Sequence, residues 1–216
     1  MRIAAITDIH GKVGKAEKLV ERLEEEDFDL LLIAGDITNF QGRGKASEIL
    51  DILERVGKPM FSIMGNCDGR DVLDLLEEKG ISLHDKRVEF GGMGFVGFGG
   101  SNKTPFSTIW EFDDRELLKS LMGNYREGDV LLVHTPPYGT KVDRIYTGRH
   151  VGSKGLRRFI EEKQPPLVIC GHIHEARGVD EIGETLIVNP GPLFRSYYAM
   201  ICLDEAGEIE ISLERV

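Results

Sequence analysis

The chain has 216 residues, of which 41% are hydrophobic and 30% are charged, and its formal net charge is −10 at pH 7. The length and composition are typical of a globular protein, and we expect residues 1–216 to form a single domain. The negative charge argues against a nucleic-acid polymer as partner, since such binding needs a basic face. No apolar stretch reaches the length of a membrane span, so we expect no membrane partner.

Cysteine content and the N-terminal stretch bear on the compartment. Cys67, Cys170 and Cys202 form no C-x-x-C pair, which excludes a disulfide framework and a structural zinc site. The stretch MRIAAITDIHGK holds too short an apolar run for a signal peptide. We therefore expect a cytoplasmic protein. No heptad pattern is present, and the sequence leaves a homo-oligomer open.

In the first third of the chain, apolar runs of strand length alternate with helical patterns. We predict strands at 2–7, 29–35 and 59–65, and amphipathic helices at 15–26 and 45–56. Strands and helices that alternate in this way form parallel strands joined by crossover helices.

The rhythm changes near residue 80. Residues 86–90 and 93–98 read as a hairpin, and a long loop is expected at 135–152. The other predicted elements are helices at about 114–122 and at 154–163, and strands at 129–134, 166–171, 185–189, 197–204 and 208–214. This mixture predicts an α/β fold, a four-layer α-β-β-α sandwich of two mixed β-sheets flanked by helices.

Polar side chains suited to metal binding follow five predicted strands. They are Asp8-x-His10, Gly35-Asp36, Gly65-Asn66-Cys67-Asp68, His134, and Gly171-His172-x-His174. The crevice at the carboxyl ends of strands is where open α/β sheets bind ligands. Each residue alone could be a turn, cap or loop residue, but those roles leave their shared position unexplained. We expect one site built from all five segments.

In this order, D-x-H, G-D, G-N-x-D, H and G-H-x-H resemble the signature of the calcineurin-like metallophosphoesterases across residues 8–174. The resemblance implies two divalent metal ions, one held by Asp8, His10, Asp36 and His174, and the other by Asp36 as a bridge, Asn66, His134 and His172. Mn²⁺ is our first choice, although Fe, Zn or Ni suits the same ligands. A hydroxide bridging the two ions would then attack the phosphorus atom.

The motif leaves the substrate open. We favour a phosphodiesterase acting on a small phosphorylated or nucleotide-like substrate. A phosphomonoesterase acting on a small metabolite is an alternative, as is a non-catalytic binding or scaffold module that retains the fold. Because all seven ligand positions carry suitable residues, an enzyme is the stronger interpretation.

The expected catalytic residues are Asp36, Asn66, His134, Cys67 and His150. Cys67 stands where many superfamily members have a histidine that protonates the leaving oxygen or binds phosphate. Three interpretations of Cys67 are open: a small substitute without a role in catalysis, a functional group near the metals, or a redox-sensitive or inhibitory extra ligand. A thiol is a poor general acid at neutral pH, so we expect a preference for good leaving groups. His150, in the basic segment 141–158, either reaches the leaving group or is an ordinary loop histidine.

Overall fold

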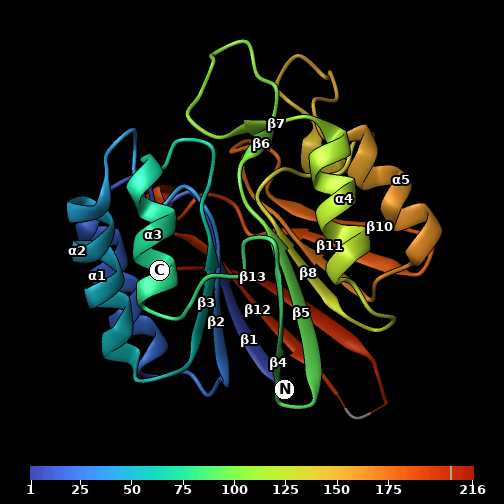
Figure 1. The fold of residues 1–216 in the computed structure, drawn as a ribbon. Helices are drawn as coiled ribbons and strands as arrows, with labels where there is room; N and C mark the ends of the chain where they lie inside the picture. Colours follow the sequence, from blue (N-terminus) through green and yellow to red (C-terminus); the bar gives the residue numbers. More distant parts are fainter. Residues whose placement is uncertain (205) are drawn as a thin grey trace.

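The computed structural model describes residues 1–204 and 206–216. Two sheets pack face to face, and each carries helices on its outer side (Figure 1). The first sheet has the strand order β13-β12-β1-β2-β3 and the second β10-β11-β9-β8-β5-β4. A short pair, β6 (Ser101–Asn102) and β7 (Glu111–Phe112), lies apart from both.

The first sheet combines a parallel core with an antiparallel edge. Its parallel strands are β1 (Arg2–Ile6), β2 (Leu30–Ala34) and β3 (Met60–Ile63). β12 (Tyr197–Leu203) pairs antiparallel with β1, and β13 (Ile209–Arg215) pairs antiparallel with β12. β2 is buried along its whole length, and its uninterrupted apolar sequence LLLIA is typical of a strand covered on both faces.

Three helices cover the outer face of this sheet: α1 (Val13–Leu23), α2 (Arg43–Leu53) and α3 (Arg70–Glu78). Alternate residues of β1 serve the two sides of the sheet. Ala4 and Ile6 pack under these helices, whereas Ile3 and Ala5 face the second sheet. Burial of apolar side chains on both faces therefore fixes the strand, and with it the start of the loop that follows its end.

The second sheet is also mixed. β5 (Met93–Phe98), β8 (Val130–Val133), β9 (Leu167–Ile169) and β11 (Thr185–Asn189) are parallel, and antiparallel β4 (Lys86–Phe90) and β10 (Gly178–Ile182) form its edges. α4 (Asp114–Asn124) and α5 (Lys154–Lys163) cover its outer face around a third core. Single 3₁₀ turns occur at Glu54–Val56, Lys141–Asp143 and Leu193–Arg195.

The predicted four-layer sandwich with two mixed sheets is confirmed, and over the described ranges it contains five α-helices. The prediction missed α3 and β10 and gave no structure to residues 101–102 and 111–112. The loop predicted at 135–152 contains the turn Lys141–Asp143. No helix within residues 1–204 or 206–216 has both the length and the apolar character needed to cross a bilayer.

Candidate metal centre

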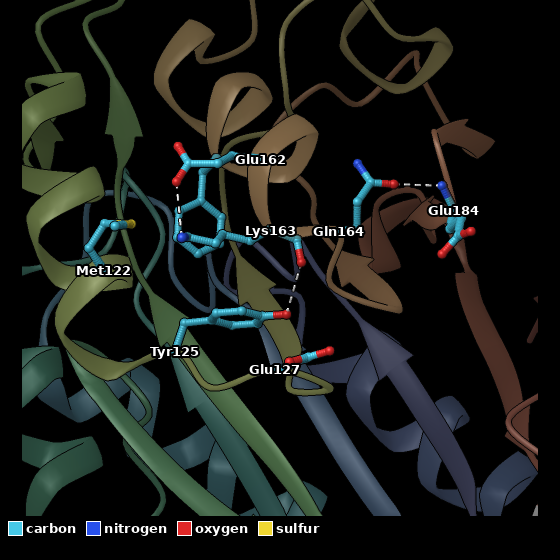
Figure 2. Close-up of a pocket in the computed structure, with 8 residues that line it drawn as sticks. Met122, Tyr125, Glu127, Glu162, Lys163, Gln164 and Glu184 are labelled. Carbon is cyan, nitrogen blue, oxygen red and sulfur yellow. Dashed lines mark hydrogen bonds and ion pairs between the residues drawn. The ribbon is translucent and has the colours of Figure 1, made fainter.

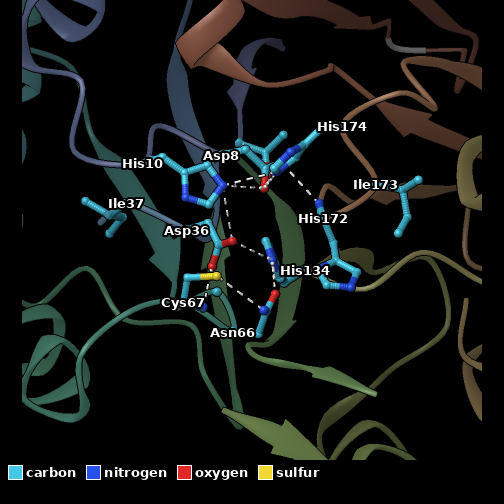
Figure 3. Close-up of polar contacts among 12 residues, drawn as sticks. Asp8, His10, Asp36, Ile37, Asn66, Cys67, His134, His172, Ile173 and His174 are labelled. Atoms are coloured by element: carbon cyan, nitrogen blue, oxygen red, sulfur yellow. Dashed lines mark hydrogen bonds and ion pairs between the residues drawn. The ribbon is translucent and has the colours of Figure 1, made fainter. Parts of the chain in front are cut away.

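The five polar segments meet at one edge of the sandwich, where the parallel strands end (Figure 3). Asp8 and His10 follow β1, Asp36 follows β2, and Asn66 follows β3 in the first sheet. The second sheet contributes His134 after β8, and His172 and His174 after β9. The structure therefore brings together residues up to 166 positions apart in the sequence, as in the contact of Asp8 with His174.

Asp8, His10 and His174 form the first group. The Nε2 atoms of His10 and His174 lie 3.1 Å apart. The Oδ1 atom of Asp8 is 3.2 Å from Nε2 of His174 and 3.7 Å from Nε2 of His10. Two imidazole nitrogens and one carboxylate oxygen thus converge on one point, an arrangement that suits a divalent cation.

Asp36 connects this group to a second one. Its Oδ2 atom is 3.5 Å from Nε2 of His10 and also 3.5 Å from Nε2 of His134. The same nitrogen of His134 is 3.0 Å from Oδ1 of Asn66. A carboxylate in this position can bind two cations at once, as a binuclear site requires.

The donor set fits two divalent cations. Ligand atoms within 4.8 Å of one another occur in three overlapping sets: Asp8, His10 and His174; Asp8, Asp36 and His134; and His10, Asp36 and Cys67. Asp8 and Asp36 are each only 1% exposed. Buried carboxylates this close to each other need compensating positive charge, and oxygen and imidazole donors suit Mn, Fe, Zn or Ni.

His172 lies beside the centre in a different way. Its ring makes an edge contact with that of His134, with centroids 5.2 Å apart, and Figure 3 shows it on the side of His134 away from Asp36. It belongs to none of the ligand sets found among the described residues. Its backbone nitrogen donates to Oδ2 of Asp8 at 3.1 Å. Its role as a ligand remains a prediction.

The backbone at the centre adopts unusual conformations. Asp8, His10, Asp36 and His172 have φ angles of 52°, 48°, 50° and 67°. Non-glycine residues adopt such angles rarely and at a cost in free energy, and they concentrate at functional sites. Gly65 permits a close approach of two loops, because a Cβ atom there would lie 2.0 Å from Oδ1 of Asp36.

The sequence analysis did not assign a role to Asp68. This buried carboxylate accepts hydrogen bonds from the backbone nitrogens of Gly65 (2.8 Å), Thr38 (2.7 Å) and Ile37 (3.2 Å). It therefore ties the loop after β2 to the loop after β3. Burial and the charge of Asp36 raise the pKa of Asp68 to about 7. Its position in G-N-x-D was the available sequence signal.

The protein's own charges favour ionised carboxylates at the centre. Burial opposes ionisation of Asp8, but the hydrogen bond with His174 and the nearby imidazoles outweigh it and hold the pKa of Asp8 below its usual range. For His134, burial is outweighed by the charge of Asp36, which raises the pKa to about 9. Burial and the charge of His134 lower the pKa of His172 to about 4. The carboxylates are thus available as cation ligands near neutral pH.

Cys67 lies within the centre. Its backbone nitrogen donates to Oδ1 of Asp36 at 2.8 Å, and its Sγ atom is 3.4 Å from Nδ2 of Asn66. Burial and the charge of Asp36 raise the pKa of the Cys67 thiol. The thiol is therefore protonated at neutral pH in the field of the protein alone, and the role of Cys67 remains a prediction.

His150 is outside the ligand sets and borders a neighbouring cavity of about 530 Å³. Its Nδ1 atom is 2.6 Å from Oδ1 of Asp143, a buried carboxylate that the sequence analysis did not identify. Asn102, which also lines the cavity, accepts a hydrogen bond from Oγ1 of Thr135 at 2.6 Å. Thr135 follows His134, so one hydrogen bond links the lining of this cavity to the segment that carries His134.

A second cavity, of about 560 Å³, lies near the ends of α4 and α5, where β9 begins (Figure 2). Its polar groups bond to one another. Lys163 pairs with Glu162 at 2.9 Å, and Gln164 accepts from the backbone nitrogen of Glu184 at 2.7 Å. None of its lining residues belongs to the ligand sets of the described chain.

Comparison with known proteins agrees with this geometry. Residues 1–176 match the family model of the calcineurin-like phosphoesterases. An uncharacterized protein of Methanocaldococcus jannaschii is 37% identical and covers 95% of this chain and 96% of its own length. A Synechococcus protein named "probable cyclic nucleotide phosphodiesterase" is 24% identical over 82% of this chain and 74% of its own. A solved Thermus thermophilus structure has the same fold, with a TM-score of 0.74 at 19% identity, and covers 98% of this chain and 97% of its own.

Proposed function

The chain belongs to the calcineurin-like phosphoesterase family, and on that premise we propose that it hydrolyses phosphodiester bonds at a binuclear metal centre. The observation that carries the proposal is the position of Asp36, 3.5 Å from both His10 and His134. One cation would be held by Asp8, His10, Asp36 and His174, and the other by Asp36, Asn66, His134 and His172. When bound, the two cations, with Mn²⁺ our first choice, supply an activated hydroxide and positive charge opposite the phosphoryl oxygens.

The chain's own residues orient the ligands. Nδ1 of His134 lies 2.6 Å from the carbonyl oxygen of Ala34, and a hydrogen bond there turns Nε2 toward Asp36. Oγ1 of Thr7 donates to Oδ2 of Asp8 at 2.9 Å, which leaves Oδ1 for the histidines. The amide of Cys67 fixes Oδ1 of Asp36 in the same way.

We assign to His150 the role of protonating the leaving group. Asp143 engages Nδ1 of His150, so Nε2 can donate a proton to a leaving oxygen held in the adjacent cavity. Cys67 lies within the centre but offers only a thiol, which is a poor general acid at neutral pH. This division of roles favours diesters with good leaving groups, and the name of the Synechococcus relative supports a diester substrate.

The three cysteines are unpaired, which supports the proposed cytoplasmic location.

The proposal is tested with metal-stripped protein reloaded with Mn²⁺. Hydrolysis of bis-p-nitrophenyl phosphate is compared with that of p-nitrophenyl phosphate in the parent, Asp36→Asn and Asp74→Asn proteins. Asp74 is an exposed residue of α3 and serves as the matched control. We expect Mn²⁺-dependent diesterase activity that only Asp36→Asn abolishes. Preference for the monoester would favour a phosphomonoesterase, and inactivity with metal bound would favour a binding module.

A further inference from the structure

Exposed aromatic side chains occur on the loops around the metal centre. Over the described part of the chain, four large hydrophobic side chains are exposed, and three of them are aromatic: Phe40 (58%), Phe106 (81%) and Tyr146 (80%). The fourth, Met122 (54%), borders the cavity near the ends of α4 and α5. Met122 lies on α4, whereas the three aromatic residues lie on loops between the helices and strands.

Hydrogen bonds attach each aromatic loop to a segment that carries a candidate ligand. The backbone nitrogen of Phe40 donates to the carbonyl oxygen of Cys67 at 2.9 Å. The end of the loop that contains Phe106 is bonded to Asn66, whose carbonyl oxygen accepts from the backbone nitrogens of Ile109 and Trp110 at 3.0 and 3.2 Å. The backbone nitrogen of Tyr146 donates to Glu175, the neighbour of His174, at 3.2 Å. Figure 1 shows the loops of Phe106 and Tyr146 on the side where the strands end.

The backbone of Phe40 is held in an unfavourable conformation. Its φ angle is 58°, in the left-handed region that bulky residues rarely adopt. A glycine or asparagine would tolerate this angle more easily. Phe40 is 58% exposed, so little burial offsets this strain, and strained residues concentrate at functional sites.

Cationic residues lie on the same loops. Lys103 precedes Phe106, and Arg144 and Arg149 flank Tyr146. Within the ranges that the structure describes, these three residues form no ion pair, although the chain has a net charge of −10. Aromatic faces beside unpaired cations are the combination that binds nucleotides, through base stacking and phosphate contacts.

We infer that Phe40, Phe106 and Tyr146 form an aromatic rim that stacks on a nucleobase of the substrate. Lys103, Arg144 and Arg149 supply positive charge beside it for the nucleotide's phosphates. The inference rests on the proposed phosphodiesterase function and deepens it, because it assigns the substrate to the nucleotide class. The same rim could instead be covered by a second copy of the chain, which the experiment below distinguishes.

The test compares two ligands that differ only in the base. Binding of adenosine 5′-monophosphate and of ribose 5-phosphate to the full-length, Mn²⁺-loaded protein is measured by isothermal titration calorimetry. Both ligands offer the same phosphate and sugar, so the ratio of their affinities isolates the base. We expect the nucleotide to bind about tenfold more tightly, as the loss of one base–aromatic stack would imply. In the F40A/F106A/Y146A variant the ratio should fall toward one, whereas M122A should retain it.

Equal affinities in the parent protein would overturn the inference, as would a ratio that the triple variant retains, or binding of neither ligand. A dimer in light scattering that dissociates in the triple variant would assign the rim to self-association instead. Binding requires no turnover. An inactive protein that still prefers the nucleotide would therefore refute the diesterase proposal but support the aromatic rim. An active diesterase without this preference would support the diesterase proposal but refute the aromatic rim.

Discussion

Gly65→Ala tests how closely the loops after β2 and β3 must approach. A Cβ atom at position 65 would lie 2.1 Å from the backbone nitrogen of Asp36, whereas ordinary contacts begin at 3.4 Å. Rotating a side chain cannot relieve a contact with backbone, so the loops of Asp36 and residue 65 must move apart by about 1.3 Å, the difference between these distances. A misplacement of this size costs roughly 100-fold in rate, and overpacking costs about 1–3 kcal/mol in the free energy of unfolding.

The matched control is Gly44→Ala in α2, where an added Cβ atom would meet nothing within 4 Å. Alanine is the better helix former, so we expect a gain of up to about 1 kcal/mol in stability and unchanged activity. The assays are Mn²⁺-dependent hydrolysis of bis-p-nitrophenyl phosphate and urea unfolding followed by circular dichroism. Activity of Gly65→Ala within fivefold of the parent protein would refute the role given to this close approach.

Three further changes have distinct expected outcomes. Cys67→His should accelerate aryl esters with poor leaving groups more than those with good ones, because an imidazole protonates the leaving oxygen more readily than a buried thiol; equal acceleration of both series would contradict this. His150→Ala should do the opposite and slow poor leaving groups most, and unchanged kinetics would remove His150 from the site. Burial lowers the pKa of His84, whose Nδ1 accepts a hydrogen bond from the amide of Gly99 at 3.0 Å. His84 therefore binds a proton more readily in the unfolded chain than in the folded one, and protonation favours unfolding. The contribution of neutral His84 to the free energy of unfolding is complete above pH 6.5 and is lost as the pH falls below it. An NMR titration giving His84 an ordinary pKa would refute this.

The residues of the candidate metal centre could be singled out from the sequence because they stand at the ends of predicted strands. Asp8, Asp36 and His134 stand one or two residues after the end of an apolar strand, and parallel strands end together at one edge of a sheet. The pairing that makes the site was not accessible in the same way. Which oxygen of Asp36 lies between His10 and His134 depends on the packing of two sheets, which no local pattern encodes.

The missed elements have physical explanations. β10, with the sequence GVDEI, is a largely half-buried edge strand that pairs only with β11, so its apolar pattern is weak. α3 spans nine residues and buries only Val72, Leu75 and Leu76, a signal of little more than two turns. Asp143 escaped notice because its burial and its contact with His150 arise from the folded loop and not from a motif.

The most direct test of the account is the metal content of the purified chain, measured by inductively coupled plasma mass spectrometry after loading with Mn²⁺ and dialysis. We expect two ions per chain in the parent protein, and fewer than one in Asp36→Asn, because the proposal gives the Asp36 carboxylate a place in both cation sites. Two ions in the parent together with loss of both metal and diesterase activity in the variant would support the binuclear centre. A single ion in the parent protein, or two ions retained by Asp36→Asn, would contradict it.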